Sequence, residues 1–190
     1  MALFSYASLE KVSLQKSESY DYLTESRAMV TADSIDLESM RYDEFDIFLS
    51  HSYADKKIIP ALKHELENHG FSVYVDWITD RLLSRESVNR ETAKILQKRM
   101  NQSKCLLYAT SKNSQNSRWM SWELGYFDGI KDKMVAIIPV KKDDSASDSF
   151  KGEEYLGLYY YIDQTSNLWI NDSETEKCIS FKNWLNGDKP

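Results

Sequence analysis

Four short apolar runs, separated by stretches with helical periodicity, constrain the fold of this chain more than any other feature. Each run holds six or seven residues rich in β-branched, aromatic and long aliphatic side chains, as strands of a buried sheet do. The runs are FDIFLS at 45–50, FSVYVDW at 71–77, KCLLYAT at 104–110 and MVAIIPV at 134–140. Their spacing predicts that strands and helices alternate along the chain.

The stretches between the runs carry the helical signal. Ile59, Leu62 and Leu66 recur at helical spacing after the first run, and an apolar face follows Ser87 after the second. After the third run, the chain is predicted to be helical from about Ser117. Strands that alternate with helices of this length imply right-handed βαβ units. We therefore expect an α/β fold with a doubly wound parallel sheet of flavodoxin-like order, covered by helices on both faces.

The two ends of the chain show weaker patterns. Residues 1–42 are polar and carry no sustained period, so we interpret them as an N-terminal extension that could hold short helices, and 43–190 as one domain. After the fourth run, LYYYID and LWIN predict two further strands. A capping box of Ser173 and Glu176 then predicts a final helix whose apolar face includes Cys178.

Charge and hydropathy exclude several kinds of partner. The net charge is −6 and both signs are scattered along the chain, so we expect binding neither to nucleic acid nor to anionic membranes. No apolar run approaches the ~20 residues of a membrane-spanning helix, and the N-terminus lacks a secretory signal. These features predict a cytoplasmic protein.

Metal and cofactor motifs are missing. Cys105 and Cys178 lie far apart and form neither a disulfide framework nor a metal pair, so we interpret both as small core residues. His64 and His69 are five residues apart, where a shared zinc ion on a helix needs a spacing of four. The six glycines form no nucleotide-binding fingerprint. We expect neither a bound metal nor a cofactor.

Polar and aromatic residues converge on one edge of the predicted sheet. Ligands of open parallel sheets bind outside the carboxyl ends of the strands. The candidate residues at this edge are Ser50, His51, Ser52, Trp77, Trp119 and Glu123. Trp119 and Glu123 are four residues apart on the helix after the third run, so they share one helix face.

The same residues also have purely structural explanations. Trp119, Trp122 and Tyr126 can pack their rings into the core, and Glu123 can be an exposed acid stabilised by the helix N-terminus. The SHS triplet at 50–52 can simply cap the next helix. Periodicity alone therefore defines a candidate cleft and leaves its chemistry open.

Three segments together resemble one protein family. YDEFDIFLSHSYADK, GFSVYVDW and SKCLLYATSKNSQNSRWMSWELGYFDG, in this order, are similar to the Toll/interleukin receptor (TIR) domain, most closely its bacterial branch. The resemblance runs from about Tyr42 to at least Val140 and rests on the F-D-x-F-L-S start and the S-x-W-x-x-x-E-L helix. It implies a five-stranded parallel sheet. In many members it also implies cleavage of NAD, as substrate, at the nicotinamide–ribose bond.

The resemblance assigns roles residue by residue. Glu123 matches the catalytic glutamate, and Trp119 matches the tryptophan four residues before it. The expected substrate-binding residues are Ser50, His51, Ser52, Trp77, Arg81 and Trp119. The loop that holds Arg81 lacks the R-D-x-x-P-G box of animal adaptor members, which argues against an animal-type adaptor.

One carboxylate suits this chemistry, because nicotinamide leaves as a neutral molecule and needs no general acid. An ionised Glu123 can stabilise the oxocarbenium-like state, and an indole beside it can stack on the cationic nicotinamide for roughly 0.5–2 kcal/mol. Whether the site excludes water at that point decides whether the ADP-ribosyl group is hydrolysed, cyclised or transferred to another acceptor.

The resemblance extends to the TIR component of Thoeris anti-phage systems, which makes an ADP-ribose-derived messenger for a separate effector protein. Self-association through the TIR domain is implied as well. Two alternatives stay open: a non-catalytic TIR–TIR interaction or adaptor module, and a nucleoside-processing transferase with a similar sheet.

Overall fold

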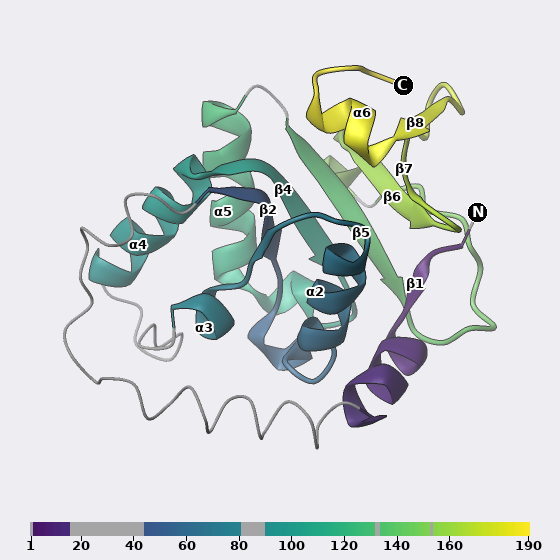
Figure 1. Ribbon diagram of the computed structural model, residues 1–190, viewed down its shortest axis with the longest axis horizontal. Helices are drawn as coiled ribbons and strands as arrows, with labels where there is room; N and C mark the ends of the chain where they lie inside the picture. The colour runs from purple at the N-terminus through teal and green to yellow at the C-terminus, as the bar shows by residue number, and fades with distance from the viewer. Residues whose placement is uncertain (1, 16–43, 81–89, 132–133, 153) are drawn as a thin grey trace.

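One sheet organises the computed structural model, which describes residues 2–15, 44–80, 90–131, 134–152 and 154–190 (Figure 1). Within these ranges the sheet has eight strands, with the order β3-β2-β4-β5-β6-β7-β8 and with β1 paired to β5. Their bounds are Phe4–Ser5 (β1), Phe45–Ser50 (β2), Val73–Tyr74 (β3), Ser103–Thr110 (β4), Val135–Lys141 (β5), Tyr160–Gln164 (β6), Leu168–Asn171 (β7) and Cys178–Ser180 (β8).

The strands from β3 to β6 form the predicted parallel sheet. β2 pairs in parallel with β3 and β4, β4 with β5, and β5 with β6. This order confirms the flavodoxin-like α/β fold and the five parallel strands that the family resemblance implies. β7 and β8 extend the sheet in antiparallel fashion beyond β6, each after a short connection.

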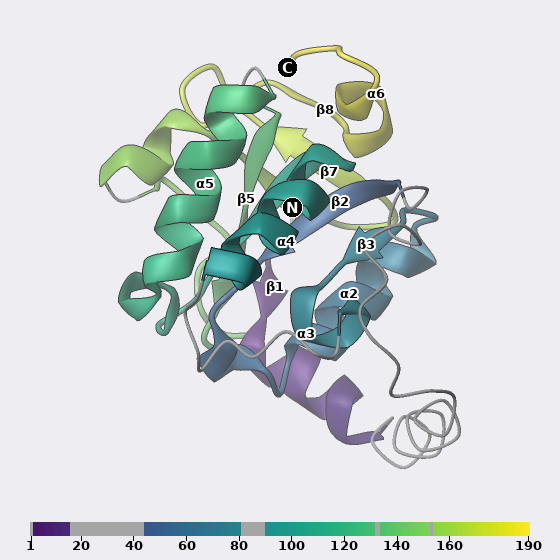
Figure 2. The same cartoon turned by 90° about the vertical axis from the view of Figure 1, so that its left-hand side faces the viewer.

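Helices cover both faces of the sheet. Their bounds are Ile59–Asn68 (α2), Asp76–Thr79 (α3), Arg90–Asn101 (α4), Arg118–Ile130 (α5) and Phe181–Leu185 (α6), with residues 6–15 also helical. Short 3-10 turns span Tyr53–Asp55 (η2), Ser114–Asn116 (η3) and Glu154–Leu158 (η4). Figure 2 shows α4 and α5 on one side of the sheet and α2 on the other.

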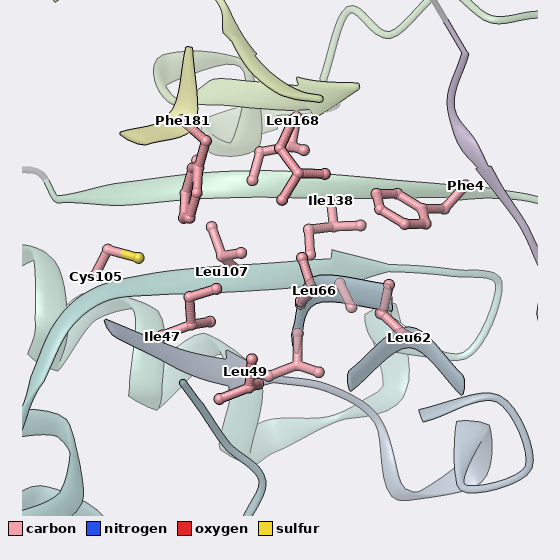
Figure 3. Packing of buried hydrophobic residues seen from close by; sticks show 14 of the residues in the cluster. Phe4, Ile47, Leu49, Leu62, Leu66, Cys105, Leu107, Ile138, Leu168 and Phe181 are labelled. Carbon is pink, nitrogen blue, oxygen red and sulfur yellow. The ribbon is translucent and has the colours of Figure 1, made fainter. Parts of the chain in front are cut away.

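Two apolar clusters, one on each face of the sheet, form the core. On the α2 side, Leu62 and Leu66 pack against alternate residues of the central strands, such as Ile47 and Leu107 (Figure 3). On the α5 side, the other residues of those strands meet α4 and α5. Each fully buried aliphatic or aromatic side chain of this kind stabilises the fold by roughly 1.5–3 kcal/mol. Burial on both faces explains why the central strands read as unbroken apolar runs.

Local signals set the ends of two helices, and the predicted helix start near Ser117 is confirmed. Ser117 caps α5, because its Oγ accepts a hydrogen bond from the Met120 backbone N–H at 3.4 Å. Pro60 lies in the first turn of α2, where its missing N–H costs no helical hydrogen bond. Gly70, with φ +88°, follows the end of α2.

The prediction of a strand over 71–77 is wrong at its end. β3 is an edge strand of only two residues, and Asp76 and Trp77 begin α3. After Val75 the backbone turns, because the Val75 carbonyl accepts hydrogen bonds from Ile78 and Thr79 instead of from a neighbouring strand. Trp77 is therefore presented by a helical turn.

The prediction of a helix across 173–187 is wrong over its first half and confirmed over its second, where α6 spans Phe181–Leu185. Asp172 accepts hydrogen bonds from the Glu174 N–H at 2.8 Å and the Thr175 Oγ1 at 2.9 Å, and this side-chain turn competes with a helix. Glu176 then adopts φ +57°, and β8 follows. The helix begins only after Ser180, so Cys178 is exposed and is not the core residue that was expected, whereas Cys105 is buried.

Part of the predicted N-terminal extension packs on the sheet. β1 pairs with β5 at Phe4↔Val140, beyond the point where β6 stops pairing, and Phe4 and Leu9 are buried. The remaining residues of the extension, 1 and 16–42, lie outside the described residues, and the domain boundary at 42–43 stays a prediction.

Candidate active site

A buried carboxylate lies at the carboxyl end of β2. Glu123, on α5, has no exposed surface, and its Oε2 accepts a hydrogen bond of 2.6 Å from the Oγ of Ser50, the last residue of β2. These two residues are separated by 73 positions in the sequence. Ser50 follows Phe48 by two residues along the strand, and Phe48 packs on the α5 side, so Ser50 faces α5 as well. The fold thus brings a strand-end hydroxyl to a carboxylate that would otherwise be costly to bury.

His51 forms a different pair with Trp77. Its Nδ1 lies 2.9 Å from the Leu49 carbonyl oxygen, and its Nε2 accepts a hydrogen bond of 2.9 Å from the Trp77 indole N–H. Only the neutral imidazole with a proton on Nδ1 satisfies both contacts. Trp77 packs against the α2-side cluster, whereas Glu123 lies on α5. His51 therefore positions Trp77 and cannot act as a base at Glu123 in this arrangement.

Ser52 and Asp55 shape the loop after β2. The Ser52 Oγ caps η2 by accepting a hydrogen bond from the Ala54 N–H at 3.3 Å. The buried Asp55 carboxylate accepts hydrogen bonds of 2.5 Å from both Ser111 and Asn113, which follow β4. The Asp55 contacts join the loop after β2 to the loop after β4. The Ser52 cap shows that the structural explanation for the SHS triplet holds at this residue.

Trp119 lies one helical turn before Glu123 and is partly buried. Its ring meets Trp122 edge to face, with centroids 5.4 Å apart, and Trp122 stacks on Tyr126 at 5.8 Å. Ring packing, the structural explanation, thus holds for Trp122 and Tyr126. The Trp119 Nε1 is buried, and no hydrogen-bond partner for it is found among the described residues.

Tyr108, on β4, belongs to the site and was not predicted. It pairs in register with Ser50 on the neighbouring strand and projects to the same side, with the α5-side cluster. Burial raises the pKa of the Tyr108 phenol to about 12, with Tyr155 and the Glu123 charge contributing further. The phenol therefore stays protonated at physiological pH. Its place in an apolar strand made Tyr108 look like a simple core residue.

The remaining predicted site residue, Arg81, lies outside the described residues. A hollow of about 520 Å³ opens beside the site, at the ends of β4 and β5, and Glu123 is not among its described lining residues. Because Glu123 has no exposed surface, a substrate reaches its carboxylate only after a neighbouring group moves.

The described residues form neither a metal-binding cluster nor a membrane-spanning helix. No group of three or more His, Cys, Asp or Glu side chains there could hold a metal ion. Among the helices described, none is long and apolar enough to cross a membrane.

Comparison with known proteins gives a family and two relatives. A family model for the TIR domain matches residues 47–179, well over half of the chain. The "Probable 3' cyclic ADP-D-ribose synthase ThsB'" of Bacillus cereus (strain MSX-D12) is 51% identical over 148 residues, which cover 74% of this chain and 75% of that protein. The "Putative cyclic ADP-D-ribose synthase TIR2" of Cytobacillus dafuensis is 37% identical over 83 residues, 43% of this chain and 22% of that protein.

Proposed function

Because this chain belongs to the TIR domain family, we propose that it is an enzyme that cleaves NAD at the nicotinamide–ribose bond and makes a cyclic ADP-D-ribose. The observation that carries this proposal is the Glu123 carboxylate, buried at the strand-end edge and held by Ser50. The relative with 51% identity over 148 residues, named as a cyclic ADP-D-ribose synthase, supports the same activity.

A single held carboxylate is sufficient for the first step. The bond between the ribose carbon and the pyridinium nitrogen breaks, and nicotinamide leaves as a neutral molecule with the bonding electron pair. The ribose carbon becomes oxocarbenium-like, and the negative charge of Glu123 stabilises it in a site with little water. Ser50 holds one carboxylate oxygen, so the charge is already in position before the bond breaks.

The second step decides the product. In cyclisation, a hydroxyl of the same ADP-ribose attacks the ribose carbon and releases its proton, which Glu123 can accept. NAD thus gives cyclic ADP-ribose, nicotinamide and one proton. We propose the 3′ hydroxyl of the adenosine ribose as the attacking group, in line with the 3′ product in the name of the Bacillus cereus relative.

Trp119 is our candidate for the nicotinamide contact. Its ring lies one turn from Glu123, is partly exposed and is supported from one side by Trp122. An indole stacked on the cationic nicotinamide contributes roughly 0.5–2 kcal/mol. A contact of the substrate with Trp77 belongs to the same proposal, and His51 and Ser52 contribute through the groups that they position.

The wider setting is also part of the proposal. We place the enzyme in the cytoplasm, in anti-phage defence of the Thoeris type, where a separate effector protein responds to the cyclic product. The free cysteines Cys105 and Cys178 fit a reducing compartment. Self-association through the TIR domain is expected too, and it could supply the movement that exposes Glu123.

Product analysis tests the activity. Purified protein at high concentration is incubated with NAD, with and without lysate of phage-infected cells as a trigger, and the products are separated by chromatography. We expect nicotinamide and a cyclic ADP-ribose in equal amounts. NAD that stays intact under both conditions would contradict the enzyme and favour the adaptor alternative, and a preference for free nucleosides would favour the transferase.

Ser50→Ala is expected to lower the rate of NAD cleavage about 10- to 100-fold, because the change removes a hydrogen bond to a charged group, worth about 1.5–3 kcal/mol. The measurement is the initial rate of nicotinamide release. Ser103→Ala is the matched control, since Ser103 is also buried and its Oγ donates to the Arg99 carbonyl at 2.8 Å. Ser103 begins β4, at the end of the sheet opposite to Ser50. Equal losses of rate in both variants would show that Ser50 acts only through stability.

A further inference from the structure

Asp55 joins the loops that follow β2 and β4. Its side chain is only 2% exposed, and its two carboxylate oxygens accept hydrogen bonds of 2.5 Å from the Ser111 Oγ and from the Asn113 Nδ2. These partners lie 56 and 58 positions after Asp55 in the sequence. β2 and β4 are neighbours in the sheet, so the two hydrogen bonds cross directly between the carboxyl ends of these strands.

The two joined loops are the walls of the crevice at which the strand order reverses. The chain leaves β2 toward α2, on one face of the sheet, and leaves β4 toward α5, on the other face (Figure 2). Ligands of open parallel sheets bind in this crevice, between strands whose following helices lie on opposite faces. Asp55 therefore braces the place where NAD is expected to bind.

On the β2 side, a short hydrogen-bonded turn connects the brace to Ser50. Asp55 belongs to η2, which is capped by Ser52. The Asp55 N–H donates a hydrogen bond of 2.9 Å to the Ser52 carbonyl oxygen, and Ser52 follows Ser50 by two residues. The turn thus fixes the Asp55 carboxylate relative to the Ser50 hydroxyl, which holds Glu123.

On the β4 side, a series of hydrogen bonds leads from the brace to the start of α5. The Ser114 Oγ donates to the Ser111 carbonyl oxygen at 2.8 Å, and the Ser117 N–H donates to the Ser114 carbonyl oxygen at 3.0 Å. Ser117 caps α5, and Glu123 lies in the second turn of that helix. The brace therefore reaches both partners of the Ser50–Glu123 hydrogen bond.

The environment of Asp55 indicates a positioning role. Both carboxylate oxygens are engaged and the side chain is buried, so Asp55 does not contact the substrate in this arrangement. The side chains that bind it, Ser111 and Asn113, are neutral. A buried anion held in this way costs more than an apolar contact of similar volume, and such groups are kept where one particular geometry is required.

We propose that Asp55 is a positioning residue for the reaction, because it holds the two walls of the crevice at the spacing that cyclisation requires. This inference rests on the proposed function. With the walls held, a hydroxyl of the same ADP-ribose is aligned to attack the ribosyl carbon, and the product is cyclic. With the walls released, water attacks that carbon in part of the turnovers, and linear ADP-ribose and one proton are released. Nicotinamide leaves in both cases.

The test is the ratio of cyclic to linear ADP-ribose formed from NAD by Asp55→Asn in the full chain. The amide keeps the size of the carboxylate, but it loses the charge that strengthens both hydrogen bonds and brings an NH2 group against one of the two donors. We expect nicotinamide release to fall about tenfold and the ratio about fivefold, because misplaced reacting groups lose alignment. The ratio does not depend on how much of the protein is folded, so a purely structural role would leave it unchanged. That outcome would overturn the inference.

Exchange of the two partners tests the contact itself. When Asp55→Asn is combined with Asn113→Asp, an amide again faces a carboxylate across the same two loops. We expect the ratio to return to within about twofold of the wild type, because the two changes are coupled through one contact. A double variant no better than Asp55→Asn alone overturns the inference.

A milder variant keeps the test usable if Asp55→Asn does not fold. Asn113→Ala removes one hydrogen bond and leaves Asp55 with its Ser111 contact. Its ratio should fall about threefold, since half of the brace remains. A ratio equal to that of the wild type would count against the proposal in the same way.

Asp46→Asn is the matched control. Asp46 accepts hydrogen bonds from the Lys104 Nζ at 2.8 Å and the Ser72 N–H at 2.9 Å, so it also joins separate parts of the sheet. It lies near the start of β2, at the opposite end of that strand from Ser50. We expect a lower thermal midpoint and a wild-type product ratio. Equal shifts of the ratio in Asp46→Asn and Asp55→Asn would show that general loosening is responsible, which overturns the inference. Intact NAD with the wild-type protein would instead refute the proposed function.

Discussion

Glu123→Gln is expected to lower NAD cleavage on the order of a thousandfold, while the protein keeps its fold. The amide has the shape of the carboxylate and its oxygen can still accept the hydrogen bond from the Ser50 Oγ, so packing at this fully buried position changes little. What is lost is the negative charge, and with it the stabilisation of the oxocarbenium-like state. Nicotinamide release and the thermal midpoint of the same preparation measure the two effects separately.

The control for Glu123→Gln is the same change at Glu91. Glu91 lies in the first turn of α4, is largely exposed and pairs with Lys94 at 3.2 Å, so its charge contributes little to stability. We expect Glu91→Gln to keep the wild-type rate. If Glu123→Gln cleaves NAD as fast as the wild type, Glu123 is not catalytic. If it loses cleavage but still signals in cells, the adaptor function is the relevant one.

The parallel core of the fold was predictable because its signal is local. β2, β4 and β5 are buried on both faces, so each reads as an unbroken apolar run. The failures concern elements that depend on distant partners or on a single side chain. β1 forms because the edge of β5 is free beyond the residues that pair with β6. The expected helix at 173–187 does not begin at Ser173, because the Asp172 side chain accepts the hydrogen bond of the Glu174 N–H.

The candidate site likewise has residues that the sequence predicts and residues that it does not. Glu123 and Ser50 follow from a helix motif and from the rule that parallel sheets bind ligands at their carboxyl ends, but their hydrogen bond spans 73 positions and no pattern reports it. Tyr108 was hidden because a tyrosine in a buried strand looks like packing.

Arg99→Ala is expected to destabilise the protein by about 3–5 kcal/mol, more than the other substitutions discussed above. Arg99 and Asp80 form a buried pair, with Nη2 to Oδ1 at 2.8 Å and Nε to Oδ2 at 3.0 Å, and the Tyr74 hydroxyl donates to the same Asp80 oxygen at 2.8 Å. The guanidinium also lies over the rings of Phe45 and Tyr74. Without Arg99, the Asp80 charge stays buried with no cation to compensate it.

The thermal midpoint should therefore fall by about 10 °C, since about 1 kcal/mol lowers it by roughly 2–4 °C in a chain of this size. Lys94→Ala, which breaks an exposed ion pair on the same helix, is the control and should cost less than about 1 kcal/mol. Asp80→Asn combined with Arg99→Ala should recover part of the loss, because it removes the uncompensated charge. A midpoint for Arg99→Ala equal to that of Lys94→Ala would mean that solvent reaches Asp80. In that case the Arg99–Asp80 ion pair would not hold the backbone in place at Asp80, which directly precedes Arg81.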